Sequence, residues 1–471
     1  MNLLELTKND LIKKCKELSI SNYSSKNKLQ LIEMIKLKLN NISNEIKTDI
    51  KPEIKPDIKT EIKPETKTDI KTEIKTKNYK FIDLFCGIGG FHSALKRFNN
   101  TECVFACDID ENCREIYEKN YGLKPEGDIT KIDIDKIPPF DFLCAGFPCQ
   151  SFSNSGKKKG LDDKRGGMIE YLLKIAEVKR PSILFLENVK HIKKINNGKV
   201  FEYILNRIDE TGYYVKDQET IFQLSPHELG IPQQRERIIF VCIRKDLYNP
   251  TKKITINIPY TEINLDKIIE TDSKKTEKYK IPKDIEDILK VWDNIIKEFE
   301  IGESLSPTIL CNEFYKNYTE EEFAKLADWK RDYITKNKSL YNKYKEKWDQ
   351  WYNKNYELLQ KKEINGKLEW QCGKKKENDS IFHYFIQFRQ SGIRVKKNEY
   401  FPTLVAIVQT PIYGKERRYI TPRECARLQS FPDDFIIHTN DHIAYKQLGN
   451  AVNVDVIYTV IKNTLDIYND I

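Results

Sequence analysis

The chain has 471 residues, enough for two or three domains, and its 80 basic and 71 acidic residues give a net charge of +9. This modest charge permits a nucleic-acid partner without requiring one. Its eleven cysteines include no Cys-x-x-Cys pair, which excludes common zinc-site spacings and is typical of reduced thiols inside a cell. No apolar run has membrane-spanning length, and the N-terminus lacks the apolar segment of a signal peptide, so we expect an intracellular protein that is not secreted.

Residues 1–42 predict a small helical module. Thr7 and Asp10 form a capping box for a first helix, and a second helix begins at Ser24 or Ser25. The expected apolar faces contain Leu11, Cys15 and Leu18, and then Leu29, Ile32, Ile35 and Leu39. Two interpretations stay open. One is a solubilising helical hairpin, and the other is a DNA-binding module, because the arrangement resembles the SAP domain, in which lysines at helix starts would contact phosphates.

Residues 43–78 predict a linker. A tetrapeptide of the form Ile-Lys-(Thr/Pro)-(Asp/Glu) repeats here, and its prolines and alternating charges allow neither a helix nor a core. We expect an extended, semi-rigid tether. The spacing of Asp57, Glu61 and Lys63 imitates a nuclease metal site, but the repeat alone generates it, so we reject that interpretation and predict no metal site.

The segment from Lys80 predicts a nucleoside-binding turn. An apolar strand leads into Gly87, Gly89 and Gly90, and a second strand ends at Asp108, about 20 residues after the glycines, where an acid accepts ribose hydroxyl bonds. Asp128, followed by Ile129, suits the amino group and ring face of an adenine. Because the turn lacks a full Gly-x-Gly-x-x-Gly and acids surround it, we expect S-adenosylmethionine rather than a nicotinamide dinucleotide.

Cys149 follows the apolar run 140–146, at the end of a predicted strand. Such a cysteine is either a small buried hydrophobe or a reactive thiol at a sheet edge. The loop Ser151–Arg165, rich in Ser, Gly and Lys, is either a solvated surface loop or a lid that closes on a phosphate backbone. Glu187 ends another apolar strand, and Arg235 and Arg237 share one face at the start of a further strand; each is either paired structurally or used in a site.

These blocks together resemble the C5-cytosine DNA methyltransferase family over residues 79–471. The resemblance depends on Asp83-Leu84-Phe85-x-Gly87-x-Gly89-Gly90, Gly146-Phe147-Pro148-Cys149-Gln150-x-Phe152-Ser153, Glu187-Asn188-Val189, Gln233-x-Arg235-x-Arg237, the run Pro422–Pro432 and the run Tyr445–Val452. It implies an α/β fold in which a Rossmann-like S-adenosylmethionine-dependent domain carries a smaller target-recognition domain. The domains expected are residues 79–245, the first catalytic part; 246–415, target recognition; and 416–471, which completes the catalytic domain.

The resemblance also implies the cofactor residues. The set is Phe85, Gly87, Ile88, Gly89, Gly90, Asp108, Ile109, Asp128, Ile129, Pro148, Asn450 and Val452. Close relatives have a tryptophan over the adenine where this chain has Ile109, so we expect weaker stacking and weaker cofactor binding.

The implied reaction begins with Cys149. Cytosine C5 becomes nucleophilic after a thiolate adds to C6, and Glu187 would neutralise charge at N3 of the ring. Arg235 would orient the base through its O2 oxygen, and Arg237 would support Glu187 or that site. The base must leave the duplex stack, so we expect base flipping with the loop Ser151–Arg165 closing behind it.

The recognition region predicts helices over 283–300 and 319–362. Their aromatic residues either belong to a core or form platforms on which bases stack, and the helical spacing favours the core. The run 385–397 alternates polar and apolar residues and is the expected DNA-reading segment. The expected DNA contacts are Ser153, Ser155 and Lys157 in the loop, and Arg389, Gln390, Arg394 and Thr403 in the recognition region.

The expected protein is thus a monomeric DNA (cytosine-5)-methyltransferase acting on duplex DNA, of the restriction–modification type, in a prokaryotic cytoplasm or a virus-infected cell. One alternative is a tRNA cytosine methyltransferase of the same fold, whose Cys-Phe-Thr tripeptide is missing from this sequence. Another is an inactive DNA-binding relative, which the intact Cys149, Glu187, Arg235 and Arg237 disfavour.

Overall fold

The computed structural model describes residues 7–18, 28, 31, 34–35, 38, 77–148, 167–389, 391–397, 399–405 and 409–469. The chain divides into two compact units, Met1–Ile74 and Lys75–Ile471. Five residues predicted for the site lie outside the described ranges: Cys149, Ser153, Ser155, Lys157 and Gln390. The whole loop Ser151–Arg165 lies outside them as well, and so does the linker 43–78 except for residues 77 and 78.

The N-terminal unit contains helix α1 (Lys8–Glu17), and its predicted capping box is confirmed. The Asp10 backbone N–H donates to Thr7 Oγ1 at 3.3 Å, and the Thr7 N–H donates to Asp10 Oδ2 at 3.0 Å. Leu11 and Cys15 are buried with Leu31 and Ile35, which lie in a second helical segment. The expected Leu29, Ile32 and Leu39 lie outside the described residues.

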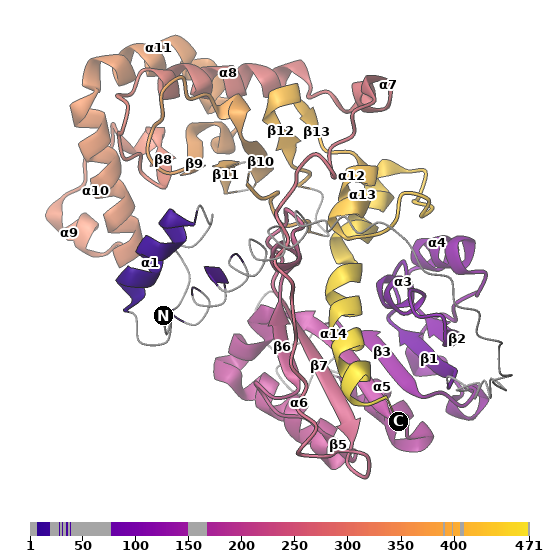
Figure 1. Cartoon of the computed structure of the whole chain (residues 1–471). Helices are drawn as coiled ribbons and strands as arrows, with labels where there is room; N and C mark the ends of the chain where they lie inside the picture. Colours follow the sequence, from indigo (N-terminus) through magenta and orange to yellow (C-terminus); the bar gives the residue numbers. More distant parts are fainter. Residues whose placement is uncertain are drawn as a thin grey trace, which may run out of the picture. The chain divides into compact units, whose positions relative to one another are not determined.

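The second unit contains two sheets (Figure 1), and Glu187 and Arg237 lie on strands of the first. Its strand order is β2-β1-β3-β4-β7-β5, with β6 paired to β7. Strands β1 to β4 pair in parallel, whereas β7 is antiparallel to β4, β5 and β6. The strands are β1 (Tyr79–Leu84), β2 (Thr101–Cys107), β3 (Phe142–Gly146), β4 (Ile183–Val189), β5 (Tyr213–Tyr214), β6 (Ile221–Leu224) and β7 (Arg237–Arg244).

Apolar side chains on both faces of this sheet are buried by helices, as expected for parallel strands that read as continuous apolar runs. On one face Phe81, Phe142 and Phe185 join a core with α3 and α14, and on the other Leu143 and Leu184 join a core with α5 and α6. The helices are α3 (Gly90–Leu95), α4 (Glu111–Tyr121), α5 (Met168–Lys179), α6 (Lys199–Glu210), α12 (Pro422–Leu428), α13 (Asp441–Asn450) and α14 (Val454–Ile467).

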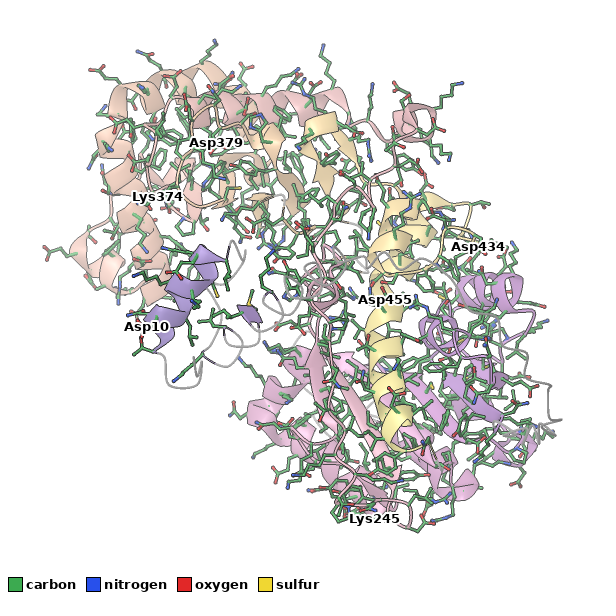
Figure 2. The ribbon with its side chains drawn as sticks, in the orientation of Figure 1. Asp10, Lys245, Lys374, Asp379, Asp434 and Asp455 are labelled. Carbon is green, nitrogen blue, oxygen red and sulfur yellow. The ribbon has the colours of Figure 1, made fainter. Side chains whose placement is uncertain are left out.

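The C-terminal helix α14 lies against α3, near the beginning of this sheet in sequence (Figure 1). Arg97, just after α3, forms an ion pair with Asp455 of α14 at 2.6 Å, and Asp455 is labelled in Figure 2. The C-terminal helix α14 therefore packs into the same core as strand β1. The α/β fold with parallel strands, predicted from the sequence, is confirmed.

The second sheet belongs to the recognition region, with the order β13-β12-β10-β11-β9-β8. Its strands are β8 (Thr308–Leu310), β9 (Lys367–Gln371), β10 (Phe385–Arg389), β11 (Gly392–Lys396), β12 (Ile412–Tyr413) and β13 (Arg418–Tyr419). All pairs are antiparallel except β9 and β11. The associated helices are α7 (Ser273–Thr276), α8 (Lys283–Lys297), α9 (Glu320–Ala324), α10 (Asp328–Lys343) and α11 (Lys345–Gln360).

The expected role of the aromatic residues in these helices is confirmed for most of them. Trp348 and Trp351 are buried in one core with Trp292 of α8 and with Ile386 and Ile393 of the sheet. Trp329, at the start of α10, and Tyr356 of α11 are exceptions, with 65% and 52% of their surfaces exposed. Asp379, labelled in Figure 2, accepts hydrogen bonds from the Tyr384 hydroxyl and the Lys376 N–H, so this buried acid is satisfied.

No helix in the described part of the chain is both long and apolar enough to span a membrane. Nor do the described residues contain a group of three or more His, Cys, Asp and Glu side chains arranged to hold a metal ion.

Candidate active site

The turn between β1 and α3 requires glycine for two separate reasons. Gly89 has φ of +87°, and a Cβ there would meet the Tyr121 ring at 2.3 Å. A Cβ at Gly90 would meet Val452 Cγ2 at 2.4 Å. The Tyr121 hydroxyl also donates to the Gly89 carbonyl at 2.8 Å. The turn is therefore packed between α4 and the C-terminal segment, which fixes the backbone that would approach a ligand.

Asp108, at the end of β2, faces this turn. Its Oδ2 accepts the Gly87 N–H at 2.8 Å, and its Oδ1 accepts the Asp110 N–H at 2.8 Å. Burial raises the pKa of Asp108 despite these two hydrogen bonds. Asp128 is different, because bonds from the backbone and hydroxyl of Thr130 lower its pKa. The two acids expected at the nucleoside are thus held by different means on neighbouring loops.

A cavity of about 520 Å³ joins most of the residues predicted from the sequence. Its lining includes Phe85, Gly87, Gly90, Asp108, Ile109, Asp128, Ile129, Pro148, Glu187, Arg235, Arg237, Asn450 and Val452. Of the predicted cofactor residues, only Ile88 and Gly89 do not line it. Ile88 is buried and Gly89 supports the turn. Residues from the turn after β1, from the ends of β2, β3 and β4, and from the C-terminal segment therefore meet at one place.

The end of the cavity near the glycine turn fits a nucleoside that carries no phosphates. Asp108, Asp110 and Asp128 line this end, and Lys446, the lysine of the lining, is paired with Asp110 at 2.9 Å. Such an acidic lining would repel a pyrophosphate. Ile109 lines the cavity with 76% of its surface exposed, which leaves an apolar side chain free to cover a ring. These hydrogen-bond acceptors and the apolar side chain fit the nucleoside part of the expected S-adenosylmethionine.

Glu187 and Arg237 form an ion pair at another part of the cavity. The Nε of Arg237 lies 2.8 Å from Glu187 Oε1, and Glu187 is only 8% exposed. Burial raises the pKa of Glu187, although Arg237 and Arg235 act to lower it. A carboxyl group in this state can hold a proton nearer neutral pH than an exposed glutamate can, which suits a proton donor.

Arg235 also lines the cavity, but its guanidinium is occupied by backbone carbonyls. Its Nη1 donates to Leu404 O at 2.6 Å, and its Nη2 donates to Gly449 O at 2.8 Å and Ala451 O at 3.0 Å. Leu404 belongs to the recognition region, and Gly449 and Ala451 line the cavity. Arg235 therefore ties the recognition region to the cavity wall, a connection that its position in the sequence did not indicate.

The backbone that leads to Cys149 is held by Asn188. The Asn188 Nδ2 donates to the Phe147 carbonyl at 2.9 Å, and its Oδ1 accepts the Val189 N–H at 2.8 Å. Pro148 lines the cavity, and Cys149 follows it directly in the sequence. Asn188 was recognised only as part of the Glu-Asn-Val block, and its position directly after Glu187 was the only signal for a structural role.

Of the expected DNA-reading residues, the structure describes three. Two lie on the recognition sheet, and Thr403 lies next to the segment that precedes Arg235. Arg389 ends β10, and Arg394 lies on β11; both form ion pairs with Glu369 of β9. The Thr403 hydroxyl donates to the backbone carbonyl of Gln234 at 2.5 Å. In this structure Thr403 therefore holds the segment that precedes Arg235.

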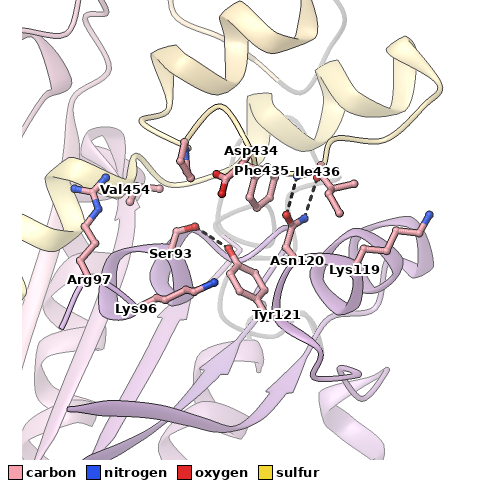
Figure 3. A pocket seen from close by; sticks show the side chains of 11 residues that line it. Ser93, Lys96, Arg97, Lys119, Asn120, Tyr121, Asp434, Phe435, Ile436 and Val454 are labelled. Atoms are coloured by element: carbon pink, nitrogen blue, oxygen red, sulfur yellow. Dashed lines mark hydrogen bonds between the residues drawn. The ribbon is translucent and has the colours of Figure 1, made fainter. Parts of the chain in front are cut away.

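A second cavity, of about 420 Å³, lies between α3, α4 and the segment that follows α12 (Figure 3). Its floor contains Ser93 and Tyr121, whose hydroxyl groups are 2.7 Å apart, and Asn120 exchanges two hydrogen bonds with the Ile436 backbone. Because Tyr121 also packs on Gly89, this cavity lies behind the glycine turn. None of the predicted site residues lines it.

Comparisons with known proteins identify the family of the chain. The model of the C-5 cytosine-specific DNA methylase family matches residues 79–466. The chain belongs to this family. It is 30% identical over 384 residues to the type II methyltransferase M.HhaI of Haemophilus parahaemolyticus, across 82% of this chain and 93% of that protein.

A second relative, the type II methyltransferase M.BanI of Aneurinibacillus aneurinilyticus, is 32% identical over 428 residues, across 82% of this chain and 95% of the relative. Among solved structures, the Entamoeba histolytica methyltransferase EhMeth aligns with a TM-score of 0.49 and 22% identity, covering 83% of this chain and 98% of that one. The match to the family extends over both sheets and leaves out the N-terminal unit.

Proposed function

We propose that this chain is a DNA (cytosine-5)-methyltransferase that uses S-adenosylmethionine and acts on a cytosine flipped out of duplex DNA. One observation carries the proposal. A single cavity holds an acid-lined glycine turn suited to a nucleoside and the buried Glu187–Arg237 pair, beside the residue that precedes Cys149. A buried acid with a raised pKa in the same cavity as the nucleoside end favours base chemistry over nucleoside binding alone.

The cofactor residues proposed are those of the cavity wall. Asp108 would accept the ribose hydroxyls, Asp128 and Ile129 would contact the adenine, and Asn450 and Val452 would close the pocket. When bound, S-adenosylmethionine supplies an electrophilic methyl group. Ile109 would cover one face of the adenine, with less stacking than an aromatic residue gives.

The base chemistry falls to Cys149 and Glu187. The thiolate of Cys149 would form a bond to C6 of cytosine. The electron pair of the C5=C6 bond would shift through C5 and C4 and place negative charge on N3. Glu187 would give or share its proton at N3, which neutralises that charge. After C5 is methylated, the C5 proton would pass to solvent, the C5=C6 double bond would form again, and the Cys149 sulfur would leave C6 as a thiolate. N3 would return its proton to Glu187.

The two arginines divide the remaining work. Arg237 has its Nε on Glu187 and its Nη1 on the Glu236 carbonyl at 2.9 Å, so it would support the acid, and it would also orient the base oxygen O2. The contacts of Arg235 with three carbonyls favour a role in holding the pocket wall. The contact of Arg235 with the base oxygen O2, which the family resemblance implies, stays a prediction.

The remaining features of the proposal concern DNA. Residues 246–415 would read the target and residues 416–471 would complete the catalytic domain that begins at residue 79. Residues 1–42 would add a SAP-like contact to duplex DNA through the 43–78 linker. The protein would act as an intracellular monomer, with Ser153, Ser155 and Lys157 in a loop that closes on DNA.

Mapping of methylated cytosines tests the proposal. The full chain is incubated with S-adenosylmethionine and either plasmid DNA or transfer RNA, and the products are sequenced after bisulfite conversion. We expect cytosines protected at one recurring sequence in the plasmid and none in the RNA. Protection of the RNA alone, or of neither substrate, would contradict the proposal.

A further inference from the structure

The recognition sheet has one apolar face and one polar face, because its side chains alternate along each strand. On the apolar face, Ile386, Ile393, Val395 and Leu368 are buried in the core with the helices α8, α10 and α11. The other face is called here the polar face. It carries Gln387 and Arg389 of β10, Arg394 and Lys396 of β11, and Glu369 and Gln371 of β9.

The polar face adjoins the catalytic residues. Phe385, on the same face of β10, packs against Phe401 with ring centroids 4.0 Å apart, and both belong to the core of the catalytic sheet. The Lys396 ammonium donates to Gln234 Oε1 at 3.2 Å, and Gln234 directly precedes Arg235. From this junction the β10–β11 hairpin extends toward its turn, so Arg394 and Arg389 lie successively farther from the catalytic sheet.

One carboxylate organises the middle of the polar face. Glu369 Oε2 lies 2.6 Å from Arg394 Nε and 3.3 Å from Arg389 Nη1, and its Oε1 accepts the Ser391 hydroxyl at 3.0 Å. Glu369 pairs with Arg394 in the strand register, and its side chain is only 14% exposed. Both arginine side chains remain more than a quarter exposed. A sequestered acid thus holds two accessible guanidinium groups.

The contact with Glu369 uses one nitrogen of the Arg394 guanidinium group and leaves the other two for a further partner. Glu369 takes its Nε, and in the described part of the chain no hydrogen bond uses its Nη1 or Nη2. These two groups form the end of a planar fork. Guanine presents two acceptors, O6 and N7, side by side in the major groove, and a bidentate arginine is the usual reader of that pattern.

Glu369 itself is a poor candidate for a base contact. An acid can accept from the cytosine N4 group, but both oxygens of Glu369 are already engaged by Arg389, Ser391 and Arg394. Two guanidinium groups with one carboxylate leave a net positive charge, which suits a face that meets DNA. Any effect of Glu369 on DNA would therefore pass through the arginines that it holds.

We propose that Glu369 is a specificity-determining positioning residue, which fixes Arg394 and Arg389 so that they read guanine in the major groove beside the target cytosine. This inference rests on the proposed function and goes further, because it predicts the chemistry of the target sequence. The other occupant that a paired arginine fits is a backbone phosphate, which would give affinity without sequence preference.

The test measures sequence preference directly. Full-length wild type, Glu369→Gln and Arg394→Gln methylate a duplex library with a cytosine flanked by random bases, and bisulfite sequencing gives the preference at each position. Arg331→Gln on α10 and Glu357→Gln on α11 are matched controls, since neither lies on the polar face. Each preference is a ratio between sequences in one sample, so partial loss of folded protein does not change it.

We expect the wild type to select guanine at one or two flanking positions. Both variants at the polar face should lower that selectivity by about 5- to 150-fold, the range for one bidentate contact, while the controls keep it. An equal loss of methylation on all sequences would overturn the inference in favour of phosphate contact. Wild-type methylation with no guanine preference would overturn it and leave the proposed function standing, whereas no cytosine methylation in any duplex would contradict both.

Discussion

The two arginines of the Gln-x-Arg-x-Arg block should fail in different ways when each is replaced by lysine. Arg235 makes three hydrogen bonds to buried carbonyls and is 3% exposed. A lysine ammonium cannot span Leu404 on one side and Gly449 and Ala451 on the other, so two of these bonds should be lost. Hydrogen bonds from a charged donor contribute about 1.5–3 kcal/mol each. We therefore expect Arg235→Lys to lower the free energy of unfolding by about 3–6 kcal/mol.

Arg237→Lys should behave in the opposite way. Its partner Glu187 can still meet an ammonium group, so the buried pair is kept and the bond from Nη1 to the Glu236 carbonyl is lost. The free energy of unfolding should therefore fall by about 1 kcal/mol or less. The rate constant kcat should fall more, because the fork that supports Glu187 and the base is lost. The same substitution at two neighbouring positions of one block thus separates a structural role from a role in the reaction.

Urea denaturation provides the assay. All five tryptophans lie between residues 292 and 370, so tryptophan fluorescence follows the recognition region, and far-ultraviolet circular dichroism follows the whole chain. A loss of 3 kcal/mol would move the midpoint by about 1 M for a slope near 3 kcal/mol per molar. An Arg235→Lys variant with the wild-type midpoint and a large loss of kcat would refute the reasoning.

Three further predictions concern the cofactor end, the acid and the N-terminal unit. Ile109→Trp should lower the Kd for S-adenosylmethionine by about 2- to 10-fold, because an aromatic ring stacks on adenine; calorimetry measures it. Burial raises the pKa of Glu187, so the protonated form works below that pKa, and wild-type kcat should fall as pH rises through it. Glu187→Gln should lower kcat by about 10²- to 10⁴-fold and lose this alkaline limb. Deletion of residues 1–78 should leave kcat unchanged and weaken duplex affinity at moderate salt.

Each of these has a contradicting result. An unchanged Kd in Ile109→Trp would show that the adenine ring does not meet this side chain. An alkaline limb that persists in Glu187→Gln would belong to another group. Equal duplex affinity with and without residues 1–78 would remove the SAP-like interpretation.

The fold, and the meeting of predicted residues at one cavity, could be predicted from the sequence because their signals are local. The glycine turn and Asp108 each follow an apolar strand directly, and Glu187 lies near the end of another. Parallel strands bring their carboxyl ends to one edge of a sheet. The capping box at Thr7 is equally local, since both of its hydrogen bonds join residues three apart.

The partners of these residues could not be predicted, because they are distant in the chain. Arg235 contacts carbonyls 169 to 216 residues away. The contact of Glu369 with Arg389 and Arg394 could not be predicted from the sequence, because it depends on the pairing of β9 with β11. Thr403 was expected to contact DNA, yet its hydroxyl is bonded to Gln234, and no pattern around residue 403 indicates that bond.

The central claim is that Cys149 attacks C6 of a flipped cytosine, and a mechanism-based trap tests it most directly. A duplex with 5-fluorocytosine at the mapped target is incubated with the full chain and S-adenosylmethionine, and the products are resolved under denaturing conditions. Because fluorine cannot leave C5 as a proton does, Cys149 cannot be expelled. We predict a covalent protein–DNA adduct whose peptide map places the bond at Cys149, and none with Cys149→Ser. Methylation of the ordinary duplex without any adduct on the fluorinated one, or an adduct that persists in Cys149→Ser, would contradict the account.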